Sequence, residues 1–131
     1  MDKPPALPAD LVKEFVIAAH GAFDKTKTLL AKTPALLNAT WDWGGGDFES
    51  AIGGAGHMGR RDIALFLIEN GARTDIFVAA MLGELDVVKA YLAKHPNMAK
   101  SGGPHGIPLI AHAEAGGAEA KAVLDHLKTL G

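Results

Sequence analysis

The sequence contains no cysteine, which excludes disulfides, thiolate metal ligands and cysteine nucleophiles. Serine is almost as scarce, because only Ser50 and Ser101 are present, and neither lies in the Gly-x-Ser-x-Gly motif of serine hydrolases. No apolar run approaches the roughly 18 residues that a membrane-spanning helix needs, so we expect no membrane segment. The first residues also lack the apolar core of a signal peptide. We expect a cytoplasmic protein, with an export signal removed upstream as the alternative.

Neither sign of charge is in large excess, because the chain has 13 Lys and Arg residues and 15 Asp and Glu residues. The densest basic point is the pair Arg60 and Arg61, which is too little to neutralise a row of phosphates. We therefore expect no nucleic-acid partner. A length of 131 residues, 48% of them hydrophobic, predicts one domain over residues 1–131, which we expect to be a monomer.

What the sequence does contain is an internal repeat. Residues 29–34 (Leu-Leu-Ala-Lys-Thr-Pro) recur as residues 91–96 (Tyr-Leu-Ala-Lys-His-Pro), and each run ends a helix-like segment at a proline. Four glycines each separate two helix-like segments: Gly21, Gly59, Gly83 and Gly116. The segments before them are residues 11–20, 48–58, 76–82 and 107–115, and those after them are 22–31, 60–70, 84–94 and 118–128. The pattern predicts four helix pairs and no strand.

Several of these segments resemble ankyrin repeats. Residues 59–75 look like the second half of such a repeat, with a turn glycine, the apolar triplet 66–68 and the Asn70-Gly71-Ala72 start of a hairpin. Residues 107–113 resemble the Thr-Pro-Leu-His opening of a repeat, and residues 79–83 are similar to the Ala-Ala-x-x-Gly that closes its first helix. The resemblance covers residues 11–130. A tetratricopeptide array is the alternative.

The resemblance implies an all-α fold, an ankyrin-repeat solenoid of stacked antiparallel helix pairs with short hairpin loops. Its approximate units are residues 8–37, 38–73, 74–100 and 101–131. The glycine spacing is irregular, and it predicts an enlarged loop around residues 41–47 and a clipped hairpin before Ile76. The function that the family implies is recognition of a partner protein through loop tips and a concave groove, without bond-making chemistry.

The enlarged loop is the most unusual stretch of the chain. It carries both tryptophans, three consecutive glycines and several acidic residues, namely Trp41, Asp42, Trp43, Asp47 and Glu49. Tryptophan is a favoured anchor in interfaces, and loops on a rigid scaffold commonly carry function. We therefore predict that these residues bind the partner. The structural alternative is that one tryptophan covers the core while Asp47 caps the next helix.

Three further residues complete the predicted surface: His57, Met81 and His105. The two histidines, with the acidic residues of the loop, would suit zinc or a small acid, which leaves a small-molecule or metal-binding pocket, and an enzyme, as the alternative function. Because no short His-x-x-x-His spacing occurs, we predict no metal site and no cofactor. No catalytic residue is assigned.

Two local patterns have structural interpretations. His112 occupies a position where alanine is usual, so we expect it to be buried and hydrogen-bonded. The glycines at 53, 54 and 56 are costly inside a helix, which favours close helix packing over the alternative of a smooth ligand groove. They form Gly-x-Gly-x-x-Gly with Gly59, but we reject a dinucleotide site because no strand is predicted before them.

Overall fold

The computed structural model describes residues 2–131 and is mostly helical, as the periodicity predicts. Its α-helices are α1 (Ala9–Ala18), α2 (Phe23–Lys32), α3 (Ala51–His57), α4 (Arg61–Glu69), α5 (Ile76–Leu82), α6 (Leu85–Lys94), α7 (Leu109–Ala115) and α8 (Lys121–Thr129). Short 3-10 turns connect them: η1 (Pro34–Leu36), η2 (Pro96–Lys100), η3 (Pro104–Gly106) and η4 (Gly117–Ala120). Within residues 2–131, no helix is long and apolar enough to cross a bilayer.

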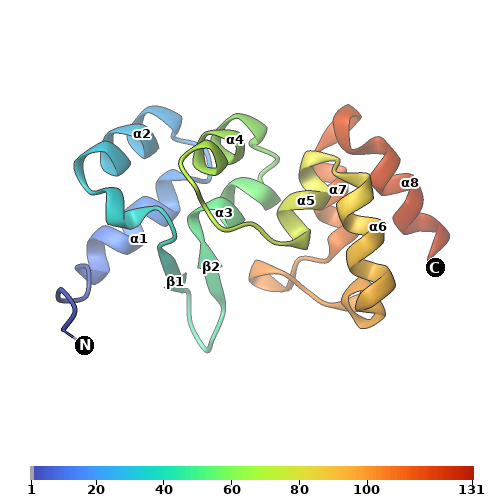
Figure 1. Ribbon diagram of the computed structural model, residues 1–131, viewed down its shortest axis with the longest axis horizontal. Helices are drawn as coiled ribbons and strands as arrows, with labels where there is room; N and C mark the ends of the chain where they lie inside the picture. Colours follow the sequence, from blue (N-terminus) through green and yellow to red (C-terminus); the bar gives the residue numbers. More distant parts are fainter. Residues whose placement is uncertain (1) are drawn as a thin grey trace.

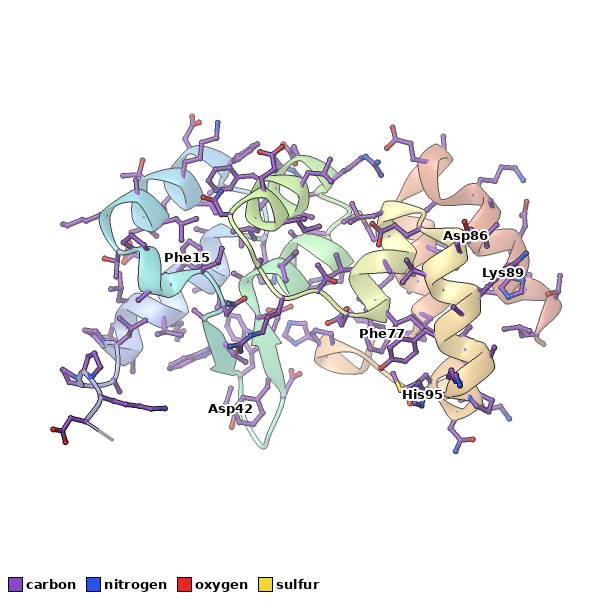
Figure 2. All side chains as sticks on the ribbon, viewed as in Figure 1. Phe15, Asp42, Phe77, Asp86, Lys89 and His95 are labelled. Carbon is purple, nitrogen blue, oxygen red and sulfur yellow. The ribbon has the colours of Figure 1, made fainter. Side chains whose placement is uncertain are left out.

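The helices form four antiparallel pairs that follow one another along the long axis of the molecule (Figure 1). Helices α1, α3, α5 and α7 contact one another in sequence order, and each packs against the second helix of its own pair. The buried side chains form two apolar clusters. Phe15 points into the N-terminal cluster and Phe77 into the C-terminal one, whereas Asp86 and Lys89 lie on the outside of α6 (Figure 2).

The prediction of no strand is wrong, because the enlarged loop is a β-hairpin. Strands β1 (Thr40–Asp42) and β2 (Phe48–Ser50) pair antiparallel, with Trp41 opposite Glu49. Three glycines, residues 44–46, turn the chain with positive φ angles, a conformation that glycine adopts without a steric penalty. One carboxylate oxygen of Asp42 accepts hydrogen bonds from the amides of Gly44 at 2.8 Å and Gly46 at 3.0 Å, which closes the turn.

The hairpin also changes where the next helix begins. Residues 48–50 are strand rather than helix, and α3 begins at Ala51 because the Ser50 hydroxyl accepts a hydrogen bond from the Gly53 amide at 3.0 Å. Ser50, and not Asp47, is therefore the N-cap. Alternation along β2 leaves Phe48 62% exposed and buries Glu49, which is 1% exposed.

The glycines of α3 permit close packing, as predicted. A β-carbon at Gly54 would lie 2.6 Å from Cε1 of His20, and one at Gly56 would lie 3.4 Å from Val78. A methyl group at position 54 would therefore collide with the His20 ring. The glycine in α3 makes room for a histidine that follows α1.

We expect the buried face of α4 to contribute to the free energy of unfolding. Leu67 is fully buried, whereas Leu65 on the same helix is 39% exposed. Leu67→Ala leaves a cavity, and we expect it to lower the free energy of unfolding by about 2–5 kcal/mol. The matched control, Leu65→Ala, should change it by less than about 0.5 kcal/mol. Urea unfolding followed by circular dichroism measures both, and equal effects would contradict this assignment of the core.

Candidate functional site

The centre of the site is a buried carboxylate at the junction of the hairpin and α3. Glu49 points into the protein from strand β2, and its Oε1 accepts a hydrogen bond of 2.9 Å from the indole nitrogen of Trp43. Oε2 is buried and has no hydrogen-bond donor. Burying an ionised carboxylate is costly unless positive charge or donors compensate it. The surroundings of Glu49 must therefore supply that compensation.

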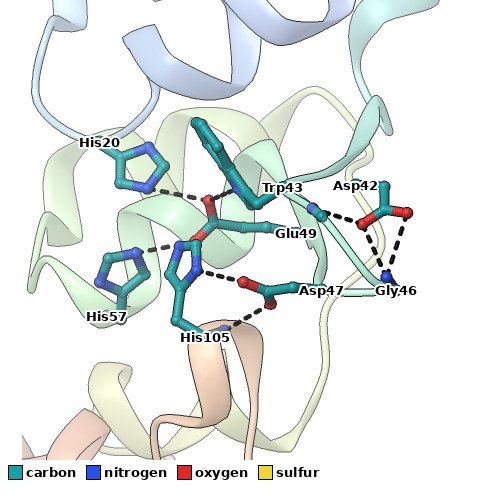
Figure 3. Close-up of polar contacts among 9 residues, drawn as sticks. His20, Asp42, Trp43, Gly46, Asp47, Glu49, His57 and His105 are labelled. Atoms are coloured by element: carbon teal, nitrogen blue, oxygen red, sulfur yellow. Dashed lines mark hydrogen bonds and ion pairs between the residues drawn. The ribbon is translucent and has the colours of Figure 1, made fainter.

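Three imidazole rings converge on this carboxylate from three separate segments (Figure 3). His20 follows α1, His57 is the last residue of α3, and His105 lies in η3. Nε2 of His20 lies 3.0 Å from Oε1 of Glu49, and the Nε2 atoms of His57 and His105 lie 2.8 Å and 3.3 Å from Oε2. One donor atom from each of the four residues lies within 4.8 Å of all the others.

The hydrogen bonds made by the Nδ1 atoms of His20 and His105 determine whether each Nε2 atom presents a proton or a lone pair to Glu49. Nδ1 of His20 lies 2.8 Å from the backbone oxygen of Val16, and Nδ1 of His105 lies 2.7 Å from Oδ2 of Asp47. Because a carbonyl and a carboxylate oxygen only accept, both Nδ1 atoms carry the proton. In the neutral rings the lone pairs are then on Nε2 and point at the Glu49 carboxylate. Such an arrangement requires a cation, either a second proton on each ring or a metal ion.

Asp47 holds His105 in place with both carboxylate oxygens. Besides the contact with the ring, Oδ1 accepts a hydrogen bond of 2.8 Å from the His105 amide. Among residues 2–131, His105 is the non-glycine residue with a positive φ, at 59°. A side chain rarely adopts this conformation without support from its surroundings, and such strain clusters at functional sites. The hairpin and the loop that contains η3 are thereby tied together.

The three rings pack edge-to-face around the donor atoms. The ring centroids of His20 and His57 are 4.9 Å apart, and those of His57 and His105 are 5.3 Å apart. Trp43 borders the cluster, with its ring centroid 5.8 Å from that of His105. The Glu49 side chain has no exposed surface, whereas those of His20 and His105 are 23% and 33% exposed. The carboxylate is thus the floor of the site and the histidines form its rim.

The titration behaviour follows from these contacts. Burial raises the pKa of Glu49, but its contacts with His20, His57 and Trp43 outweigh burial and bring that pKa well below its usual range. The hydrogen bond to Glu49 raises the pKa of His20 despite partial burial. The amide and ring of His105 lower the pKa of Asp47. Both carboxylates are therefore ionised at neutral pH.

The structure brings together five of the predicted residues: Trp43, Asp47, Glu49, His57 and His105. Asp42 instead closes the hairpin turn, and Trp41 is half-buried against the N-terminal cluster. The prediction that Met81 contacts a partner is wrong, because its side chain is packed inside the core between neighbouring helices.

His112 is buried as expected, with Nδ1 3.0 Å from the backbone oxygen of Pro108, and burial lowers its pKa. His20 was not predicted as a site residue. It lies two residues beyond the end of α1, just before the turn glycine Gly21, whereas His57 is the last residue of α3, two residues before the turn glycine Gly59. The repeat pattern therefore held a signal that could have found it.

Removing the Asp47 carboxylate is expected to release the η3 loop. In Asp47→Ala the His105 amide loses its acceptor, so its hydrogen exchange should become faster. Asp42→Ala is the control, because it should accelerate exchange at Gly44 and Gly46 and leave His105 unchanged. NMR-detected exchange measures each amide separately. An unchanged His105 amide in Asp47→Ala would show that other contacts hold this loop.

Chemically, the cluster offers three imidazole nitrogens and one carboxylate oxygen at a single point, with a second carboxylate behind one of the rings. Such a set can hold protons or coordinate a metal ion. The arrangement contains no serine or cysteine nucleophile. In comparisons with known proteins, no family model matches the chain and no curated protein matches it.

Proposed function

We propose that this protein binds a divalent transition-metal ion through His20, Glu49, His57 and His105. The observation that carries the proposal is the convergence of three Nε2 atoms on the buried carboxylate of Glu49, whose Oε2 has no hydrogen-bond donor. Nε2 of His57 approaches that oxygen to 2.8 Å without hydrogen-bond alignment. Two lone-pair donors that approach each other in this way are typical of ligands that share an ion.

The distances suit one ion. Ligand atoms about 2.0–2.1 Å from a common ion lie roughly 2.9–3.4 Å from their neighbours in tetrahedral or octahedral geometry. The Nε2 atoms of His57 and His105 lie 2.8 Å and 3.3 Å from Oε2 of Glu49, which is close to this range, and Nε2 of His20 lies 3.0 Å from the other oxygen, Oε1. The widest separation in the cluster, 4.8 Å at most, requires a small inward movement of the rings.

The surroundings of the ligands support the same proposal. Metal-binding histidines usually donate their second ring proton to a carbonyl or a carboxylate, which fixes the tautomer and the ring orientation. His20 does so through Val16, and His105 does so through Asp47. Both rings are therefore already oriented with Nε2 available. A bound cation would also compensate the buried charge of Glu49.

The donor set indicates the class of metal. Three imidazole nitrogens and one carboxylate suit Zn²⁺, Co²⁺, Ni²⁺ or Fe²⁺, whereas Ca²⁺ and Mg²⁺ favour sites built from oxygen. Without thiolate ligands, the site has no preference for the softest metals. Zn²⁺ is the simplest probe because it has no redox chemistry.

Metal binding is tested by titrating Zn²⁺ into the untagged, EDTA-treated full chain by calorimetry. We expect one ion per chain, and loss of measurable binding in His57→Ala, which removes one ligand. His95→Ala is the matched control, because His95 is exposed at the end of α6, outside the cluster (Figure 2). Asp47→Ala should weaken binding by about 10–100-fold through the orientation of His105. Equal binding by wild type, His57→Ala and His95→Ala would contradict the proposal.

We propose that the scaffold is an ankyrin-type solenoid. The resemblance of residues 59–75 and 107–113 to ankyrin repeats supports it, as does the row formed by α1, α3, α5 and α7. The hairpin and the η3 loop project on the same side of that row (Figure 1). The stacking of helix pairs brings His20, His57 and His105 from the first, second and fourth units to one site.

Recognition of a partner protein is a second candidate function, and one observation favours it. Phe48 is 62% exposed on the projecting hairpin, which also carries the partly exposed Trp43. An exposed aromatic side chain on a rigid hairpin is a suitable anchor for an interface.

The partner hypothesis predicts that a protein captured from the native cell extract by wild type is lost with Phe48→Ser. Val87→Ser is the control, because Val87 is similarly exposed but lies on α6. Mass spectrometry identifies the captured protein, and circular dichroism checks that both variants stay helical. Capture that is the same for all three proteins would exclude the hairpin as the contact surface.

A further inference from the structure

We propose that the metal site keeps a coordination position that faces solvent and takes a small anionic ligand of carboxylate size. This inference rests on the proposed metal binding and extends it, because a site closed by the protein would serve only the fold. Four protein ligands close a tetrahedral zinc site, whereas a metal that accepts up to six ligands keeps positions open around the same four donors. Three features of the cluster favour the open kind.

The first feature is the asymmetry of burial. Glu49 forms the fully buried floor, whereas the side chains of His20 and His105 are 23% and 33% exposed. Donors from all four residues therefore reach the ion from the protein side and from the rim. We expect the side of the ion opposite Glu49, where the side chains of His20 and His105 are partly exposed, to face solvent.

The second feature is the role of Trp43 as a positioning residue. Its indole N–H donates to Oε1 of Glu49 at 2.9 Å, while Oε2 lacks a donor. Because one oxygen is held by the indole, the carboxylate binds a metal through one oxygen rather than two. The protein then supplies four donor atoms, and Co²⁺, Ni²⁺ and Fe²⁺ accept up to six. At least one position is left for a ligand from outside.

The third feature is charge and size. A divalent ion with three neutral imidazoles and one carboxylate keeps a net positive charge, which attracts an anion. Asp47 does not compete for the ion, because both of its oxygens are engaged by the amide and ring of His105. The imidazole rings pack edge-to-face with centroids 4.9 Å and 5.3 Å apart, so the rim admits only a small ligand. Acetate and azide are suitable probes of this class.

The test uses the untagged full chain loaded with Co²⁺, whose visible absorption reports the number and kind of ligands. Azide titrated into this protein is expected to shift the Co²⁺ bands in a saturable manner, and acetate should compete with it. Unchanged bands at every azide concentration, in a protein that does bind Co²⁺, would overturn this inference and leave the metal site standing. Absence of Co²⁺ binding itself would overturn both proposals.

Trp43→Phe provides a second, independent test. The variant keeps an aromatic ring but removes the donor to Oε1, so both oxygens of Glu49 become free to bind the ion. We expect Co²⁺ binding to persist and azide binding to weaken several-fold, with altered bands before any azide is added. His95→Ala should behave as wild type in both titrations. Azide binding by Trp43→Phe that equals wild type would exclude the proposed role of the indole.

Discussion

The buried carboxylate of Glu49 is the constraint on which the arrangement of the site depends. It lies in the second strand of the hairpin beneath three imidazole rings, and its side chain lacks exposed surface. A negative charge at such a place is tolerated only where cations or donors surround it closely. His20, His57 and His105 converge on it, and protons on their Nε2 atoms or a bound metal ion would supply the compensating positive charge. The indole of Trp43 adds the remaining neutral donor.

The helical scaffold makes this convergence possible. The row of inner helices sets the distance between consecutive units, and Gly54 in α3 lets the His20 ring approach where a β-carbon would collide with it. The hairpin and the η3 loop project together and are joined by Asp47 and His105, although these residues are 58 positions apart. The same contact with Asp47 holds the left-handed backbone of His105, so the group that stabilises this strained conformation also positions the imidazole ring.

The sequence predicted the helices well because their signals are local. Apolar spacing and turn glycines placed all eight segments, and α5 has the predicted bounds, Ile76–Leu82. The errors arose where contacts between residues distant in the sequence determine the local structure or the burial of a side chain. Residues 48–50 were predicted as helix, but their pairing with residues 40–42 makes them a strand, and the Ser50 cap delays the helix to Ala51. Met81 was predicted at the surface, but stacking of neighbouring helix pairs buries it.

For the site, the sequence identified most of the residues, and it gave a metal-binding pocket only as the alternative function. It singled out Trp43, Asp47, Glu49, His57 and His105 as unusual, and the structure brings these five residues together. The absence of a short histidine motif argued against a metal site. Spacing along a single helix reveals only ligands that lie on that helix, and it does not reveal ligands that come from separate segments. By itself, the sequence determined the helix pairs and their order, which follow from periodicity within single segments. Only the tertiary structure decided that Glu49 is buried beneath three histidines, because that depends on the hairpin register and on the stacking of separate units.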